Sequence, residues 1–376
     1  MNLERIDELF SENFLRLGEL GASLSVWRHG EEVLLLADGF CDRQKTKPWM
    51  ESTMVLVWSA VKGPAAACVL HSLQEHSLSP AMPVADVWPE FAQAGKGRIT
   101  IGQLLSHQAG LVALSADMPV FDHDAVADAL ARQEPFWTPG EGHGYHPRTY
   151  GFLVDEIVRR LSGMPLGEYW RKVFAKPLHL DFWIGLPESE FHRVAPVQAT
   201  RNTHPEDSFW QAFSNPRSLT ARAFTSPRGL QSVGSMNSPE TWSRSFPGFG
   251  GIGTAHGLGK FYAMLANDGT WDDHRFFSSA ALDWMTTALT DGHDRVLQLE
   301  TAFSAGFMKD PVKPDGKKVR TTFGPSPLAF GQPGAGGSVA FADPENGIAF
   351  SYMMNQMEPG VLPNAKALRL IGELYR

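Results

Sequence analysis

Short apolar runs of β type lie near both ends of the chain. Two of them, 22–27 and 32–37, flank a turn containing Gly30, and this spacing predicts a β-hairpin. A second pair, 339–342 and 348–353, is joined by a turn rich in Asp, Pro, Asn and Gly and predicts another hairpin. Strands of an antiparallel sheet are therefore expected at both chain ends.

Apolar residues at helical spacing dominate the middle of the chain and its two extremities. This spacing predicts helices over residues 1–10, 59–75, 99–107, 124–132, 148–161, 254–267 and 363–375. Thr100 is a candidate N-cap, and Gly163 is a candidate stop signal. Most of the predicted helices thus fall between the two strand-forming ends.

The segment 199–251 has no clear periodicity and is dense in Ser, Pro, Asn, Gly and aromatic residues. It predicts a long irregular loop, and a loop of this length in a compact protein is usually functional. Its aromatic rings indicate an apolar wall for a substrate. The alternative is a surface excursion that these rings merely anchor.

Composition narrows the classes of protein that fit this pattern. The 376 residues are 43% hydrophobic and 20% charged, as in a globular protein with ample core. A net charge of -8 argues against nucleic acid as a partner. With two cysteines and no HExxH or Cys-x-x-Cys pattern, we expect no disulfide framework, no metal and no other cofactor.

Targeting signals are not evident in the sequence. No run approaches the roughly 18 apolar residues that a membrane span needs, so no span is expected. Residues 1–10 lack the basic end and apolar block of a secretory signal. We therefore expect a cytoplasmic location, although a processed periplasmic form would have the same sequence features.

Ser59 and Lys62 open the predicted helix 59–75 and lie three residues apart. This spacing brings a hydroxyl and an amine onto one face of the first turn. Pro64 has no N–H, which indicates a 3₁₀ opening turn with the α-helix beginning near residue 63. The pair is a candidate nucleophile and base, and the alternative is a chance Ser-x-x-Lys pattern.

Tyr145 and His107 are two further candidates. Tyr145 lies in a loop just before the helix 148–161, where a phenol can face a cleft and transfer protons. The alternative is a loop tyrosine that packs its ring on Trp137. For His107 we favour a helix-end histidine hydrogen-bonded to a neighbouring loop over a base or metal ligand.

A glycine-rich stretch, 331–338, precedes the C-terminal hairpin. Glycines let a strand backbone approach a ligand closely, as an edge that binds an oxyanion requires. The alternative is that they serve only a bend in the sheet. The chain contains no Gly-x-Ser-x-Gly elbow, which argues against an α/β-hydrolase, and the near match 336–340 lies in this stretch.

Taken in order, these segments resemble the serine β-lactamase and penicillin-binding-protein superfamily, and within it class C β-lactamase-like esterases (family VIII-type carboxylesterases). The likeness rests on residues 48–49, 59–64, 88–91, 104–111, 144–146, 251–255, 334–338 and 341–344. It implies an α/β (α+β) β-lactamase/transpeptidase-like fold, with a central antiparallel sheet flanked by helices. One lobe would combine 1–75 with 295–376, and a mostly helical lobe, 76–294, would carry the cleft loops 199–251.

The resemblance also implies roles for individual residues. Ser59, Lys62 and Tyr145 would be catalytic, and the backbone N–H groups of Ser59 and Ala335 would form the oxyanion hole. Gln332 and Gly334 would contact the substrate.

The chain departs from the family pattern at two motifs. Tyr145 is followed by His146 and Pro147, where the family often has Tyr-x-Asn. Gln332-Pro333-Gly334 replaces Lys-Thr-Gly or His-x-Gly. A neutral glutamine cannot form the charge-assisted hydrogen bond that a substrate carboxylate would need.

These features predict a serine carboxylesterase that acts on a small short-chain ester through an acyl-enzyme, with Lys62 or Tyr145 as base. The alternatives are a weak β-lactamase or D-amino-acid peptidase or amidase and, in another class, a non-catalytic binding protein that retains the fold. The sequence does not determine the acyl group, the alcohol group or the oligomeric state.

Overall fold

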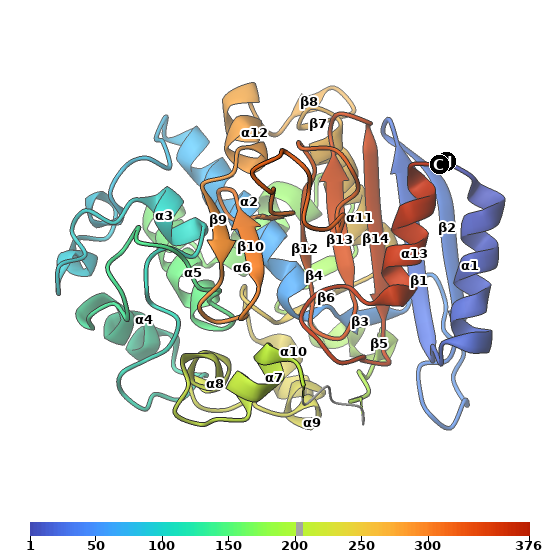
Figure 1. The fold of residues 1–376 in the computed structure, drawn as a ribbon, viewed down its shortest axis with the longest axis horizontal. Coiled ribbons are helices and arrows are strands. Elements are labelled where there is room, and N and C mark those ends of the chain that lie inside the picture. Colours follow the sequence, from blue (N-terminus) through green and yellow to red (C-terminus); the bar gives the residue numbers. More distant parts are fainter. Residues whose placement is uncertain (201–205) are drawn as a thin grey trace.

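The computed structural model describes residues 1–200 and 206–376. Its largest element is an eight-stranded antiparallel sheet in the order β2-β1-β14-β13-β12-β11-β10-β9 (Figure 1). The strands are β1 (Gly21–Arg28), β2 (Glu31–Gly39), β9 (Thr290–His293), β10 (Glu300–Phe303), β11 (Met308–Lys309), β12 (Phe330–Pro333), β13 (Val339–Asp343) and β14 (Ile348–Met354). Because β1 pairs with β14, the two ends of the chain meet inside one sheet.

Side-chain size differs between the two faces of this sheet. On β13 and β14, Phe341 and Phe350 belong to the apolar cluster that contains α1 and α13, whereas Ala340 and Ala349 belong to the cluster that contains α11. Successive residues of a strand point to opposite faces, so on β13 and β14 the phenylalanine rings line one face and the alanines the other. A Cβ on Gly259 of α11 would lie 2.7 Å from Ser25 Oγ, so this glycine lets the helix pack closely on the small-residue face.

The helices surround the sheet and fill the rest of the molecule. The α-helices are α1 (Leu3–Arg16), α2 (Lys62–Glu75), α3 (Ile101–Leu105), α4 (His123–Arg132), α5 (Thr149–Ser162), α6 (Leu166–Trp170), α7 (Ser208–Phe213), α8 (Leu219–Thr225), α9 (Val233–Met236), α10 (Pro239–Ser243), α11 (Ala255–Ala266), α12 (Ser279–Thr286) and α13 (Ala365–Leu374). Short turns of other helix types are η1 (Trp58–Val61), η2 (Val84–Asp86), η3 (Pro89–Ala92), η4 (Arg171–Ala175) and η5 (Glu188–Arg193). The buried α2 packs on α5 and α6 at the centre of the helical part.

Two smaller sheets complete the fold. One has the strand order β4-β6-β3-β5, and the other is a two-stranded hairpin. Their strands are β3 (Met54–Leu56), β4 (Phe182–Ile184), β5 (Val194–Ala195), β6 (Gly251–Gly253), β7 (Thr270–Trp271) and β8 (His274–Arg275). The pairing of β3 with β6 fixes the chain that leads directly into η1.

Most sequence predictions of local structure are confirmed. Both hairpins form, and the opening turn of the helix at Ser59 is 3₁₀ before α2 begins at Lys62. Thr100 caps α3 in a full capping box, although this helix is shorter than predicted. Gly163 ends α5 in the left-handed conformation.

The prediction of a long irregular loop at 199–251 is wrong for the parts of this segment that form helices. Four short helices, α7 to α10, occupy 208–243. Their N-caps are Asp207, Ser218, Ser232 and Ser238. The Ser-rich composition that favours loops is equally typical of repeated helix starts. Residues 201–205 of this segment lie outside the described residues.

The boundaries of the two lobes stay a prediction. Two observations bear on it: α11 packs against β1, β13 and β14, and β9 is an edge strand of the large sheet. Both elements fall in the segment 76–294 that we assigned to the helical lobe.

Among the helices of 1–200 and 206–376, none has the length and apolarity that crossing a membrane requires.

Candidate active site

Ser59 lies in η1, in a turn held on both sides by backbone hydrogen bonds. The Val57 N–H donates to the Gly251 carbonyl at 2.9 Å, and the Ala60 N–H donates to the Val57 carbonyl at 3.1 Å. Trp58, directly before the serine, has a φ of 49°, which is rare for a bulky residue. Such backbone strain persists only where surrounding structure imposes it, and it is concentrated at functional sites.

Lys62 is almost fully buried, and its amine has three close neighbours. Nζ lies 3.3 Å from Ser59 Oγ, 2.9 Å from the Pro147 carbonyl and 2.5 Å from the Gly248 carbonyl. Burial lowers the pKa of this amine well below its usual 10.5. Carbonyl oxygens only accept, so Lys62 donates to Pro147 and Gly248, and its third contact is a hydrogen bond donated to Ser59 Oγ.

Tyr145 is buried beside this pair. Its ring lies 4.7 Å from Lys62 Nζ and packs on the rings of His107 and Phe303. Burial raises the pKa of the phenol above its usual 10, and hydrogen bonding to Ser59 opposes this only in part. The tyrosine is therefore a neutral phenol that can donate a proton.

Gln332 lies on β12 with a buried side chain. Its Nε2 donates to Tyr145 Oη at 3.1 Å. Ser59 Oγ accepts a hydrogen bond from Lys62 Nζ, and hydrogen bonding to Ser59 lowers the pKa of Tyr145, as a donor to the phenol oxygen does. The predicted contact of Gln332 with substrate stays a prediction, because its amide is engaged by Tyr145.

Gly334 brings the end of β12 against η1. A Cβ on this residue would lie 2.1 Å from the Val57 carbonyl oxygen, so no larger residue permits this approach. Ala335 follows in a turn, and within residues 1–200 and 206–376 no acceptor takes its N–H. The Ser59 N–H lies in the first turn of its helix, where amides lack partners within the helix. Their role as the oxyanion hole stays a prediction.

Pro147 and His146 occupy the motif in which the expected Asn is missing. The Pro147 carbonyl reaches Lys62, as described above. The His146 Nδ1–H donates to the Gly144 carbonyl at 2.8 Å, and Nε2 accepts the Leu111 N–H at 3.0 Å. These partners fix one neutral tautomer, and burial lowers the pKa of His146 to about 3.

His107 also stays neutral, because burial lowers its pKa well below 6.5. Its Nδ1 accepts the backbone N–H of His146 at 3.2 Å. This contact confirms our interpretation of a histidine hydrogen-bonded to a neighbouring loop. Sequence reasoning did not find the Pro147 and Gly248 carbonyls that hold Lys62. Every residue has a carbonyl, so no sequence signal marks them.

These histidines predict an acid-labile fold. Below about pH 6.5 the unfolded chain binds protons that buried His107 and His146 exclude, so stability falls as pH falls. The loss is about 1.4 kcal/mol per pH unit for each such histidine, or about 2 kcal/mol between pH 6.5 and pH 5. Urea unfolding of the wild type and His146→Gln at both pH values measures it. The variant should lose less stability on acidification, and equal slopes for the two proteins would contradict the prediction.

The strained turn at Ser59, the buried amine of Lys62 and the buried phenol of Tyr145 thus lie together in one site. A family model described as Beta-lactamase matches residues 6–373. The chain therefore belongs to the beta-lactamase family, in the class of β-lactamase-like serine hydrolases, as its sequence motifs predicted.

Three individual proteins show where the chain falls within this family. Esterase/beta-lactamase LipL of Mycobacterium tuberculosis (strain ATCC 25618 / H37Rv) is 29% identical over 352 residues, covering 90% of this chain and 77% of LipL. A crystal structure of a family VIII carboxylesterase has a TM-score of 0.88 and 33% identity, covering 99% of this chain and 96% of that one. A penicillin-binding protein homologue from Caulobacter crescentus has a TM-score of 0.86 and 36% identity, covering 98% and 96%. These similarities confirm the predicted fold class.

Proposed function

We propose that the chain is a carboxylesterase that hydrolyses short-chain esters through an acyl-enzyme on Ser59. The observation that carries this proposal is the 3.3 Å approach of Ser59 Oγ to the buried amine of Lys62, whose other neighbours are carbonyls. The similarity to LipL and to a family VIII carboxylesterase supports ester substrates.

Acylation begins when Ser59 Oγ attacks the ester carbonyl carbon and its proton passes to Lys62. The N–H groups of Ser59 and Ala335 stabilise the oxyanion, each by about 3 kcal/mol. As the C–O bond of the alcohol breaks, the Tyr145 hydroxyl protonates the leaving oxygen. The resulting phenolate then takes the proton from the Lys62 ammonium.

Deacylation returns the site to its starting state. Water attacks the acyl carbon, its proton passes to Lys62, and the acyl–oxygen bond breaks as Ser59 regains a proton. The products are one carboxylic acid and one alcohol. The lowered pKa of Lys62 and the raised pKa of Tyr145 support lysine as base and tyrosine as acid.

Gln332 favours esters over β-lactams. A substrate carboxylate gains about 1.5–3 kcal/mol from a hydrogen bond to a charged group, or roughly 10–100-fold in affinity, and a neutral amide does not provide this. The wild type should therefore have a higher kcat/KM for p-nitrophenyl butyrate than for a chromogenic cephalosporin.

The matched variant Gln332→Lys should move the ratio of these two rates toward the cephalosporin by about tenfold. Steady-state assays of both proteins on both substrates measure the ratio. A cephalosporin rate in the wild type that equals or exceeds the ester rate would instead support the β-lactamase alternative. A preference for D-amino-acid amides would support a peptidase or amidase.

A further inference from the structure

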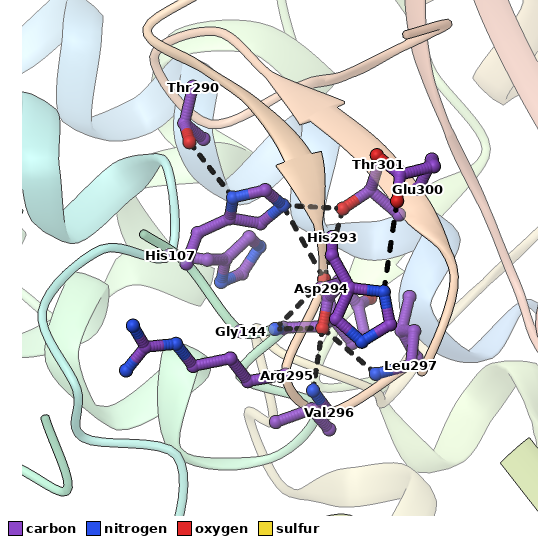
Figure 2. Close-up of polar contacts among 12 residues, drawn as sticks. His107, Gly144, Thr290, His293, Asp294, Arg295, Val296, Leu297, Glu300 and Thr301 are labelled. Carbon is purple, nitrogen blue, oxygen red and sulfur yellow. Dashed lines mark hydrogen bonds and ion pairs between the residues drawn. The ribbon is translucent and has the colours of Figure 1, made fainter. Parts of the chain in front are cut away.

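Asp294 lies in the loop between β9 and β10, and its carboxylate is fully buried. It lies 149 residues from Tyr145 in the sequence, yet both of its oxygens accept the Tyr145 N–H, at 3.0 and 3.1 Å. Oδ1 also accepts the N–H groups of Val296 and Leu297, each at 2.8 Å. Figure 2 shows Asp294 with Val296 and Leu297 beside it.

A second group of side chains supports the other oxygen of Asp294. The Thr301 hydroxyl donates to Oδ2 at 3.1 Å (Figure 2). It also lies 2.7 Å from His143 Nε2, and the Thr290 hydroxyl lies 2.9 Å from His143 Nδ1. The neutral Nε2–H tautomer of His143 fits both contacts: the Thr290 hydroxyl donates to Nδ1, and the Nε2–H donates to the Thr301 hydroxyl. Burial lowers the pKa of His143, consistent with this neutral form.

Isolating a carboxylate from water is costly unless donors surround it. Asp294 has three backbone N–H donors and a hydroxyl, and two of those N–H groups belong to its own loop. The third, from Tyr145, is the exception, because it comes from a distant segment. The carboxylate therefore ties the tyrosine loop to the large sheet.

The same loop also contacts the helix α8. The Thr220 hydroxyl donates to the Val296 carbonyl at 2.8 Å. Arg148, three residues after Tyr145, donates to the Phe224 carbonyl of α8 at 3.4 Å. Helix α8 thus contacts both the loop of Asp294, through Thr220, and the segment after Tyr145, through the Arg148 side chain.

We propose that Asp294 is a positioning residue that holds Tyr145 at the distance from Ser59 at which its phenol can protonate the leaving alkoxide. The inference rests on the proposed function. Asp294 touches neither Ser59 nor the substrate, and it acts through the backbone N–H of Tyr145. A displacement of about 1 Å in such a group can cost on the order of 100-fold in rate.

The test uses the leaving group of the substrate. Nitrophenolate leaves without a proton, whereas an alkoxide needs one from Tyr145. Asp294→Asn replaces one of the two acceptor oxygens by an NH₂ group and removes the negative charge, so the hold on the Tyr145 N–H is weakened. We expect kcat/KM for ethyl butyrate to fall about 10–100-fold. For p-nitrophenyl butyrate, kcat/KM should change by less than about threefold, because no proton is required.

Two further variants identify the route of the effect. Tyr145→Phe should show the same dependence on leaving group, and the double variant should be no slower than Tyr145→Phe alone, since residues that act as a unit are not additive. If Asp294→Asn folds poorly, Thr301→Val removes one donor to Asp294 and should shift the ethyl to nitrophenyl ratio in the same direction.

Asp310→Asn is the matched control. The Asp310 side chain is also buried, and its carboxylate accepts the N–H groups of Thr322 and Phe323 in another loop. Its substitution should lower the melting temperature without changing the ratio of the two esters. Equal losses on both esters in Asp294→Asn, or an additive double variant, would overturn the inference. Full activity of Ser59→Ala would instead overturn the proposed function.

Discussion

Ser59→Ala should lower kcat/KM for p-nitrophenyl butyrate by on the order of 10⁴-fold or more. The hydroxyl is the nucleophile, and no acyl-enzyme forms without it. The rest of the site stays in place, because Ser59 is held by the backbone of its turn and the Ser59 N–H remains. Rates of nitrophenol release by the wild type and by Ser59→Ala, measured on the same ester, give the loss.

Ser338→Ala is the control for this experiment. Ser338 is buried and lies in a near match to a Gly-x-Ser-x-Gly elbow. It should retain both activity and labelling by a fluorophosphonate probe, whereas Ser59→Ala should lose both. Labelling that persists in Ser59→Ala, or disappears in Ser338→Ala, would place the nucleophile elsewhere.

Lys62→Met should lower kcat/KM by about 10²–10⁴-fold, the usual contribution of a general base. Lys62→Arg should lose a similar amount, because a guanidinium stays protonated at all working pH values and cannot accept the Ser59 proton. If Lys62 served only as a positive charge, arginine would restore activity. Steady-state rates of both variants on the same ester separate these two roles.

The pH profile of the wild type tests the same role independently. Only the neutral amine is a base, so kcat/KM should fall as pH decreases through the pKa of Lys62 and should be constant above it. Because burial lowers that pKa, the fall should begin well below the usual 10.5 of lysine. A profile that keeps rising up to pH 10.5 would indicate an ordinary exposed lysine instead.

Local features of the fold were predictable because they depend on neighbouring residues. The hairpin of β1 and β2 needs only apolar runs and a turn, and the capping box of α3 needs only Thr100 and Gln103. The helices α7 to α10 were missed for an equally local reason. Ser and Asp favour both loops and N-caps, and helices of four to seven residues are too short to show a period.

In the site, too, contacts between sequence neighbours were predictable and contacts between distant segments were not. Ser59 and Lys62 are predictable as a pair because a helical turn makes positions three apart adjacent. The contact between Gln332 and Tyr145 joins residues 187 positions apart, and only the order of family motifs brought them into one hypothesis. The carbonyls that contact Lys62 depend on how two loops fold, which no residue type reveals.

The pairing of β1 with β14 has a consequence for how the chain folds during synthesis. Ala22 pairs with Met354, so the N-terminal hairpin lacks its neighbour in the sheet until nearly the whole chain has been made. Until then β1 has an unpaired edge, which is a typical site of aggregation in partly folded chains. The large sheet, and with it the β12 edge beside Ser59, is therefore completed late, and activity should appear only after the last strand has been released from the ribosome.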